Sequence, residues 1–446
     1  MITDKILAEQ ISGSVYIGGA DNTNISIVTT RLRNQTAGKY VPNLSKDPKI
    51  DTTPVDTIAP LDVFAKDGYY VVGNKIFRHK VYAMQDASRK SLKPTDVKWV
   101  FNEHVFDKID WKTSNHVPLL ELYRRRAQQL REKYSYLVLA FSGGGDSTNV
   151  MDSFILNNIH LDEVVVHWPR HLTAGRYTPN LSSDATNFMS EWDYLVEPKL
   201  KWLEKTAPKT KITIVDNMMD LRPKEPGSNL VTLSSRHTYN GHKRYQAWDD
   251  VLLERQKVHK NCAIIQGVGP PRLITVGRHL MTYFTDLEDS RSDITDQGLH
   301  RNVEFFYCTP DMPEIVREQT HACLQGLRAK PAMIDYVGAW AVDGKFNHKD
   351  ISRPGCEIRR RWIKSILYPT YDYTQLQVNK PLNHNHRSEW FSWLYDNPHS
   401  KEIVQPHISA ITSHENIIDP SFFVKINGVV VRYVEFKTKM YHIGDI

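Results

Sequence analysis

The clearest candidate for chemistry in this chain is the hexapeptide Ser142-Gly-Gly-Gly-Asp-Ser147. Its three glycines allow the backbone to bend sharply and to approach a ligand with no Cβ in the way. An apolar run precedes it, and a helix-like pattern follows from Thr148 to Asn158. At the start of a helix, unpaired N–H groups and the positive end of the helix dipole attract anions. The ligand that this arrangement favours is a phosphate chain.

The elements around the hexapeptide alternate between strand-like and helix-like patterns. Short apolar runs predict strands, and apolar residues at three- and four-residue intervals predict helices. This order predicts an α/β fold with a doubly wound parallel sheet, whose ligands bind at the carboxyl ends of the strands. The expected strands are 136–141, 163–168, 211–216 and 262–266, and the expected helices are 148–158, 184–205 (interrupted near Pro198) and 245–258.

Other patterns flank this sheet. Hairpins are expected about Gly73-Asn74, Gly277-Arg278 and Asn427-Gly428. A helix is expected over 118–134, with solvated arginines at 124–126. A strand over 304–307 and a helix from Pro313 to about Gly326 are expected further along the chain. We therefore expect three regions. They are an N-terminal extension with a β-hairpin (1–115), a domain that carries the glycine-rich loop (116–290), and a mixed α+β C-terminal region (291–446) that binds substrate or caps the site.

Two common phosphate loops do not fit the hexapeptide. A Walker A loop has Lys-Ser/Thr where this chain has Asp146-Ser147, and a dinucleotide fingerprint needs G-x-G-x-x-G. The S-G-G-x-D-S signature does match, so residues 134–290 resemble the Rossmann-like PP-loop ATP pyrophosphatases of the adenine nucleotide α-hydrolase-like superfamily. With Tyr-Arg-Arg-Arg-Ala (123–127) and Glu-Phe-Phe-Tyr (304–307), the wider chain is also similar to PP-loop proteins of tailed bacteriophages.

The resemblance implies adenylation chemistry with ATP and Mg²⁺. In that family a substrate oxygen attacks the α-phosphorus, pyrophosphate leaves, and a second nucleophile displaces AMP. Pyrophosphate would be held by backbone N–H groups and hydroxyls of Ser142, Gly143, Gly144, Gly145, Asp146 and Ser147. Asp146 would be a Mg²⁺ ligand, because a bare carboxylate beside pyrophosphate would repel it. Asp146, Ser147 and Arg272 are the expected catalytic residues.

Further contacts are expected at the ends of the other strands. By the same resemblance, the main chain of Val166, His167 and Trp168 would bind adenine, although core packing explains the last two side chains equally well. Gly267 would allow close approach of the substrate, and Arg272 would hold an α-phosphate or a carboxylate. Asp216 would contact metal or substrate, or would cap a helix. The substrate candidates Arg236, His237, Lys243 and Arg244 would bind phosphates, unless this stretch is a solvated loop.

The fourth strand departs from the family pattern. Many relatives carry a Gly-His-Asn-x-Asp-Asp-like stretch there, whereas this chain has Gln-Gly-Val-Gly-Pro-Pro-Arg over 266–272. A second metal ligand and a general base are therefore left unassigned. Another basic segment, Arg359-Arg-Arg-Trp-Ile-Lys364, would suit single-stranded nucleic acid, but a charged, solvated helix face is the preferred interpretation.

The cysteines argue against sulfur chemistry. The four cysteines (Cys262, Cys308, Cys323 and Cys356) form no C-x-x-C pair, which indicates structural thiols in a reducing compartment. A formal net charge of +6 over 446 residues permits an anionic substrate. Because no signal peptide and no apolar run of about 18 residues is visible, we expect a cytoplasmic protein without a membrane partner, in the host cytoplasm if it is phage-encoded.

The expected function is that of an ATP-dependent ligase. It would adenylate a substrate oxygen and transfer the activated group to a nitrogen nucleophile, with a small molecule or a nucleobase as substrate and nucleic acid left open as a partner. One alternative is a nucleotide-binding protein without turnover. Another is a sulfur-transfer or adenylyl-sulfate reductase-like PP-loop enzyme.

Overall fold

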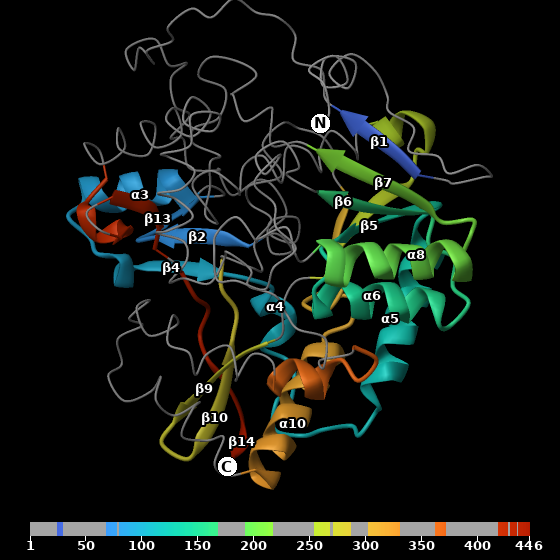
Figure 1. Ribbon diagram of the computed structural model, residues 1–446. Helices are drawn as coiled ribbons and strands as arrows, with labels where there is room; N and C mark the ends of the chain where they lie inside the picture. Colours follow the sequence, from blue (N-terminus) through green and yellow to red (C-terminus); the bar gives the residue numbers. More distant parts are fainter. Residues whose placement is uncertain are drawn as a thin grey trace, which may run out of the picture.

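The computed structural model (Figure 1) describes residues 25–29, 68–77, 80–167, 192–216, 254–267, 271–286, 302–330, 362–371, 418–426, 429–434 and 436–446. It contains a six-stranded sheet with the strand order β1-β7-β6-β5-β8-β11 and parallel pairing throughout. The strands are β1 (Ile25–Thr29), β5 (Tyr136–Phe141), β6 (Glu163–His167), β7 (Lys211–Asp216), β8 (Cys262–Gln266) and β11 (Val303–Phe305).

The strand order reverses between β5 and β8. The chain runs from β5 outward through β6 to β7, and it then returns to add β8 on the opposite side of β5. In parallel sheets such a reversal leaves the two connections on opposite faces, and ligands bind beside the carboxyl ends there. The predicted α/β parallel sheet is therefore present. The edge strand β1 was not predicted.

Three helices cover one face of this sheet: α5 (Leu119–Lys133), α6 (Gly145–Ile155) and α8 (Glu197–Thr206) (Figure 1). They bury an apolar face against Leu139, Val164 and neighbouring strand residues. On the other face a separate apolar cluster surrounds Val165 and Ile264. Residues 254–258 are helical, and Arg255 pairs there with the buried carboxylate of Glu163 at 2.6 Å.

One helix begins earlier than predicted, and a second changes type near Pro198. The helix after the glycines begins at Gly145 and not at Thr148, because the Thr148 N–H donates to the Gly144 carbonyl and closes the first turn. The interruption expected near Pro198 takes the form of a change from π-helix to α-helix at Glu197. Pro198 itself lies in the first turn of α8, where a missing N–H costs no intrahelical bond, and a π-helical turn (Trp192–Val196) precedes it.

Smaller elements surround the sheet. All three expected hairpins are present: β2–β3, β9–β10 and β12–β13. The strands are β2 (Tyr69–Val72), β3 (Lys75–Phe77), β4 (Val97–Val100), β9 (Arg272–Val276), β10 (His279–Tyr283), β12 (Phe423–Ile426), β13 (Val429–Tyr433) and β14 (Tyr441–Asp445). The helices are α3 (Lys80–Arg89), α4 (Glu103–Phe106) and α10 (Glu314–Ala329), with 3₁₀ turns at Pro94–Asp96 and Pro420–Phe422. Residues 362–367 are also helical.

The predicted solvated face of α5 is wrong at one residue. Arg124 and Arg125 are exposed and pair with Glu121, but Arg126 is fully buried. Its guanidinium donates to Glu304 at 3.0 Å and to the Phe305 carbonyl at 2.9 Å. The two segments that flank the glycine loop in the sequence therefore meet in space, because this ion pair joins α5 to β11.

Candidate functional site

The hexapeptide forms the turn between β5 and α6, at the carboxyl end of β5 and beside the reversal in strand order. Gly143 adopts a φ of +76°, which favours glycine. A Cβ at this position would also lie 2.6 Å from Cγ2 of Val196, which belongs to the turn that precedes α8. Gly143 is therefore required both by its backbone conformation and by the close approach of the neighbouring helix.

The backbone of this turn offers several donors. The first three N–H groups of α6 (Gly145, Asp146 and Ser147) lack an intrahelical acceptor, and within the described ranges no other acceptor meets them. The Ser147 hydroxyl, in contrast, stabilises the turn. It accepts from the Ser142 N–H at 3.1 Å and is 3.2 Å from the Gly144 carbonyl. The unpaired N–H groups and the helix dipole form an anion-binding arrangement.

Asp146 lies in the first turn of α6 and pairs with a lysine remote in the sequence. Its Oδ2 atom is 2.5 Å from Nζ of Lys364, and both side chains are half-buried. Its Oδ1 atom is buried and makes no hydrogen bond of normal geometry with the described residues, and the buried Tyr368 hydroxyl interacts with the same carboxylate. A buried carboxylate oxygen without a donor of normal geometry is costly, so this atom fits a cation or a donor supplied by a ligand.

Two buried tyrosines lie beside Asp146. The Tyr307 hydroxyl donates to the Asp146 carbonyl at 2.8 Å and accepts from Asn149 at 2.9 Å. The Tyr368 ring packs against that of Tyr307, with centroids 5.5 Å apart. Burial, with the charge of Asp146 adding to it, raises the pKa of both hydroxyls well above 10.0. Both hydroxyls therefore stay protonated at neutral pH, and Tyr307 remains a donor that fixes the first turn of α6.

Residues 362–371 contact both the glycine loop and α6. Lys364 meets Asp146 in the first turn, and Thr370 donates to Asp152 two turns later at 3.2 Å. Lys199 of α8 pairs with the same Asp152 carboxylate at 2.7 Å. The Tyr371 hydroxyl is 3.5 Å from the Gly143 carbonyl, at the outer limit of a hydrogen bond. A segment from the C-terminal region therefore packs over the glycine loop and its helix.

The structure places some of the predicted site residues at the same edge of the sheet. Val166 of β6 pairs with Phe141 of β5, the residue immediately before the loop. His167 is the last residue of β6, and Asp216 is the last residue of the neighbouring strand β7. A Cβ on Gly267 would lie 3.0 Å from the Asp146 carbonyl. Gly267 thus packs directly beneath the loop, which gives it a structural role at the predicted location.

The remaining predicted residues are Arg272 and a group outside the described residues. Arg272 opens β9, in the hairpin that follows the parallel sheet, and is half-buried. The residues Trp168, Arg236, His237, Lys243 and Arg244 lie outside the described residues, as does Cys356. Sequence reasoning missed Lys364, Tyr307 and Tyr368. It noticed the basic segment that ends at Lys364, but the prediction of a solvated helix face is wrong for Lys364 itself.

The described cysteines do not form a reactive centre. Cys262, Cys308 and Cys323 are all buried. Burial raises the pKa of Cys262 and of Cys323 to about 12, which disfavours the nucleophilic thiolate.

No protein-family model, no curated protein and no solved structure matches this chain. Within the described ranges, no helix combines the length and the apolar character needed to cross a membrane. The assignment of function therefore depends on the loop and its surroundings.

Proposed function

We propose that this protein is a PP-loop ATP pyrophosphatase with a Rossmann-like fold, which adenylates a substrate oxygen and transfers the activated group to a nitrogen nucleophile. In the first step the oxygen bonds to the α-phosphorus of ATP, and the bond from that phosphorus to the β-bridging oxygen breaks to release pyrophosphate. In the second step the nitrogen displaces AMP. The observation that best supports this proposal is a glycine turn with unpaired N–H groups beside the ion pair of Asp146 and Lys364.

The described residues fit an anion with its counter-cation. The first-turn N–H groups of α6 suit pyrophosphate oxygens, and Lys364 supplies a positive charge at the same place. The buried Oδ1 atom of Asp146 suits Mg²⁺, a cation that prefers oxygen ligands. When bound there, Mg²⁺ would neutralise negative charge on the departing pyrophosphate. The ion pair with Lys364 also balances the charge of the Asp146 carboxylate.

A nucleotide-binding protein without turnover is the second candidate. The same ion pair favours it, since Lys364 satisfies one oxygen of the only described carboxylate in the loop. Sulfur chemistry has less support, because the described cysteines are buried and their thiolates are disfavoured. Adenine binding at Val166–Trp168, an α-phosphate contact from Arg272, and substrate contacts from Asp216 or the basic segment 236–244 remain parts of the proposal.

The deciding experiment measures which nucleotide is formed. The protein is incubated with Mg²⁺, ATP labelled at the α-phosphate, and panels of carboxylates, amides and nucleobases with an amine donor, and AMP is resolved from ADP. We expect AMP and pyrophosphate in equal amounts. ADP as the sole product would refute the proposal, whereas ATP binding without AMP from any panel would favour the second candidate.

Two variants and one control assign the residues. Asp146→Asn should abolish Mg²⁺-dependent AMP formation, and Lys364→Met should lower its rate by about 100-fold or more, since donors at developing charge are worth that much. The control is Lys201→Met, which removes an exposed lysine that pairs with Glu197 on α8. If the Lys364 and Lys201 variants are equally active, Lys364 takes no part in the reaction.

A further inference from the structure

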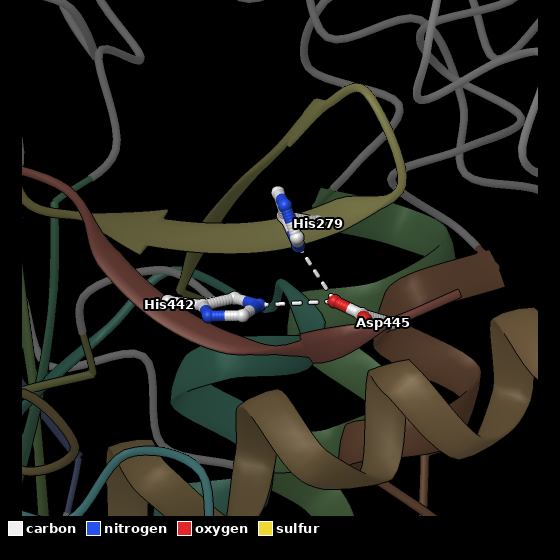
Figure 2. A group of neighbouring side chains, drawn as sticks. All are labelled: His279, His442 and Asp445. Atoms are coloured by element: carbon white, nitrogen blue, oxygen red, sulfur yellow. Dashed lines mark hydrogen bonds and ion pairs between the residues drawn. The ribbon is translucent and has the colours of Figure 1, made fainter.

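We propose that His279, His442 and Asp445 bind a divalent transition-metal ion of the Zn²⁺ class, at a site separate from the glycine loop. The three side chains lie on β10 and β14, which pair in the three-stranded sheet β14-β10-β9. Within the described ranges, these three side chains form a group whose ligand atoms lie close enough together to hold one metal ion. Figure 2 shows both imidazole rings directed at the same carboxylate.

A β-bulge brings the three residues to one face. In a regular strand the side chains at i and i+3 point to opposite faces, so His442 and Asp445 should be separated. The register between β10 and β14 shifts, however: Gly444 pairs with Leu280, and His442 pairs with Met281. Ile443 is the extra residue and is fully buried. The bulge therefore returns Asp445 to the face of His442, and bulges commonly re-aim side chains in this way at functional sites.

The resulting distances suit one ion. Oδ1 of Asp445 lies 2.6 Å from Nδ1 of His279 and 3.2 Å from Nε2 of His442, and the ligand atoms all lie within 4.8 Å of one another. Zinc binds imidazole nitrogen and carboxylate oxygen at about 2.0–2.2 Å in a tetrahedral arrangement, which separates neighbouring ligand atoms by roughly 3.3 Å. Small rotations of the two rings would bring all three ligands to that separation.

The backbone that carries these ligands is fixed from two sides. Nε of Arg328 on α10 donates to the Asp445 carbonyl at 2.9 Å. A Cβ on Gly444 would lie 2.9 Å from Leu324 of the same helix, so the bulge packs closely against α10. At the other side His279 pairs directly with Asp445 across the ladder. The side chains themselves are 55% (His279), 28% (His442) and 58% (Asp445) exposed, so an ion can enter from solvent.

The donor set selects the kind of metal. Two imidazoles and one carboxylate suit Zn²⁺, Co²⁺ or Fe²⁺, whereas Mg²⁺ and Ca²⁺ prefer oxygen ligands alone. Three protein ligands leave coordination positions for water or for a further ligand. An ion bound here would also link β14 to the β9–β10 hairpin, and it would therefore stabilise the C-terminal strand.

The test is metal binding by the metal-free full chain after removal of any affinity tag. Co²⁺ is titrated with visible absorption as the readout, and Zn²⁺ is titrated by calorimetry in the presence of excess Mg²⁺. We expect one equivalent with the intense absorption of a low-coordinate Co²⁺ site, and Zn²⁺ should raise the melting temperature. Asp445→Asn and His442→Ala should each lose this equivalent. Arg328→Ala should keep it with an affinity about 10–100-fold lower, as expected for a positioning residue.

A matched control removes a histidine of another His–Asp pair. His160 lies 3.3 Å from Asp162, and no third ligand joins this pair within the described residues. His160→Ala should bind metal as the wild type does. Circular dichroism in metal-free buffer should be the same for all variants, and His442→Asn replaces His442→Ala if that variant unfolds. The proposal fails if the wild type binds neither Co²⁺ nor Zn²⁺, or if Asp445→Asn retains the full stoichiometry.

Discussion

At the scale of single residues, the site depends on a tyrosine that bears no charge. Tyr307 donates to the Asp146 carbonyl and accepts from Asn149, and its ring is buried. Tyr307→Phe removes the added hydrogen bond to the Asp146 carbonyl and leaves the buried Asn149 amide without this acceptor, so we expect the free energy of unfolding to fall by about 1–3 kcal/mol. Because the first turn of α6 loses its anchor, ATP affinity should fall as well. Urea unfolding and calorimetric ATP titration measure the two effects.

Tyr123 provides the matched control. Its hydroxyl is equally buried, donates to the Leu367 carbonyl at 2.9 Å and accepts from Gln319 at 3.0 Å. Tyr123→Phe should therefore cost a similar free energy of unfolding and leave ATP affinity close to the wild-type value. If both variants lose ATP affinity equally, Tyr307 acts through general stability and not through Asp146.

The sequence predicts only part of this site, for a reason that concerns distance along the chain. The loop is a local motif, so its glycines and Asp146 could be identified from six consecutive residues. Lys364 and Tyr307 contact Asp146 across 218 and 161 positions. No local spacing links them, and a basic segment such as 359–364 looks the same whether it faces solvent or a carboxylate.

At the scale of elements, the position of the glycine turn depends on close packing with the helix beside it. Gly143 and Gly277 both have positive φ, at +76° and +60°, but only Gly143 has a neighbour at its Cβ position, Val196 at 2.6 Å. Gly277→Ala should cost about 1 kcal/mol from backbone strain alone. Gly143→Ala adds a steric clash of about 1–3 kcal/mol, and it should weaken ATP binding because the turn must shift.

Thermal unfolding of the two glycine variants, with ATP titration beside it, separates strain from packing. If Gly143→Ala and Gly277→Ala lose the same stability, Val196 yields without cost and the close approach of the two elements is not a constraint. Unchanged ATP affinity in Gly143→Ala would show that the turn tolerates the shift.

Elements are also the level at which the sequence was most informative. Apolar runs and turn residues predicted β5, β7 and β8 with their observed bounds, together with the three hairpins. The start of α6 was placed too late, because glycines are poor helix formers and their role in the first turn has no periodic signal. The bulge at Ile443 could not be foreseen, since register depends on the partner strand and on packing against α10.

At the scale of the whole molecule, one buried junction joins parts of all three regions expected from the sequence. Lys80 at the start of α3 pairs with Asp286, which follows β10, at 2.6 Å, and both side chains are almost fully buried. Asp286 also accepts from the Tyr70 hydroxyl and from the Phe436 N–H, each at 2.9 Å. One hydrophobic cluster extends from Tyr70 to Ile443 through the same place. The described parts of these regions therefore share a core.

Removing one member of this junction should be costly, because it leaves the other charge buried without its partner. We expect Lys80→Met to lower the free energy of unfolding by about 3–5 kcal/mol, whereas the double variant Lys80→Met with Asp286→Leu should lose less than the sum of the single losses. The exposed pair Lys439–Asp107 is the control, and Lys439→Met should cost at most about 1 kcal/mol. Urea unfolding, followed by tryptophan fluorescence and by circular dichroism, is measured for the wild type, both single variants of the junction, the double variant and the Lys439 variant. Additive losses, or equal losses from the Lys80 and Lys439 variants, would contradict a coupled junction.

Coincident transitions by the two probes are also expected, because a shared core should make the described regions unfold together.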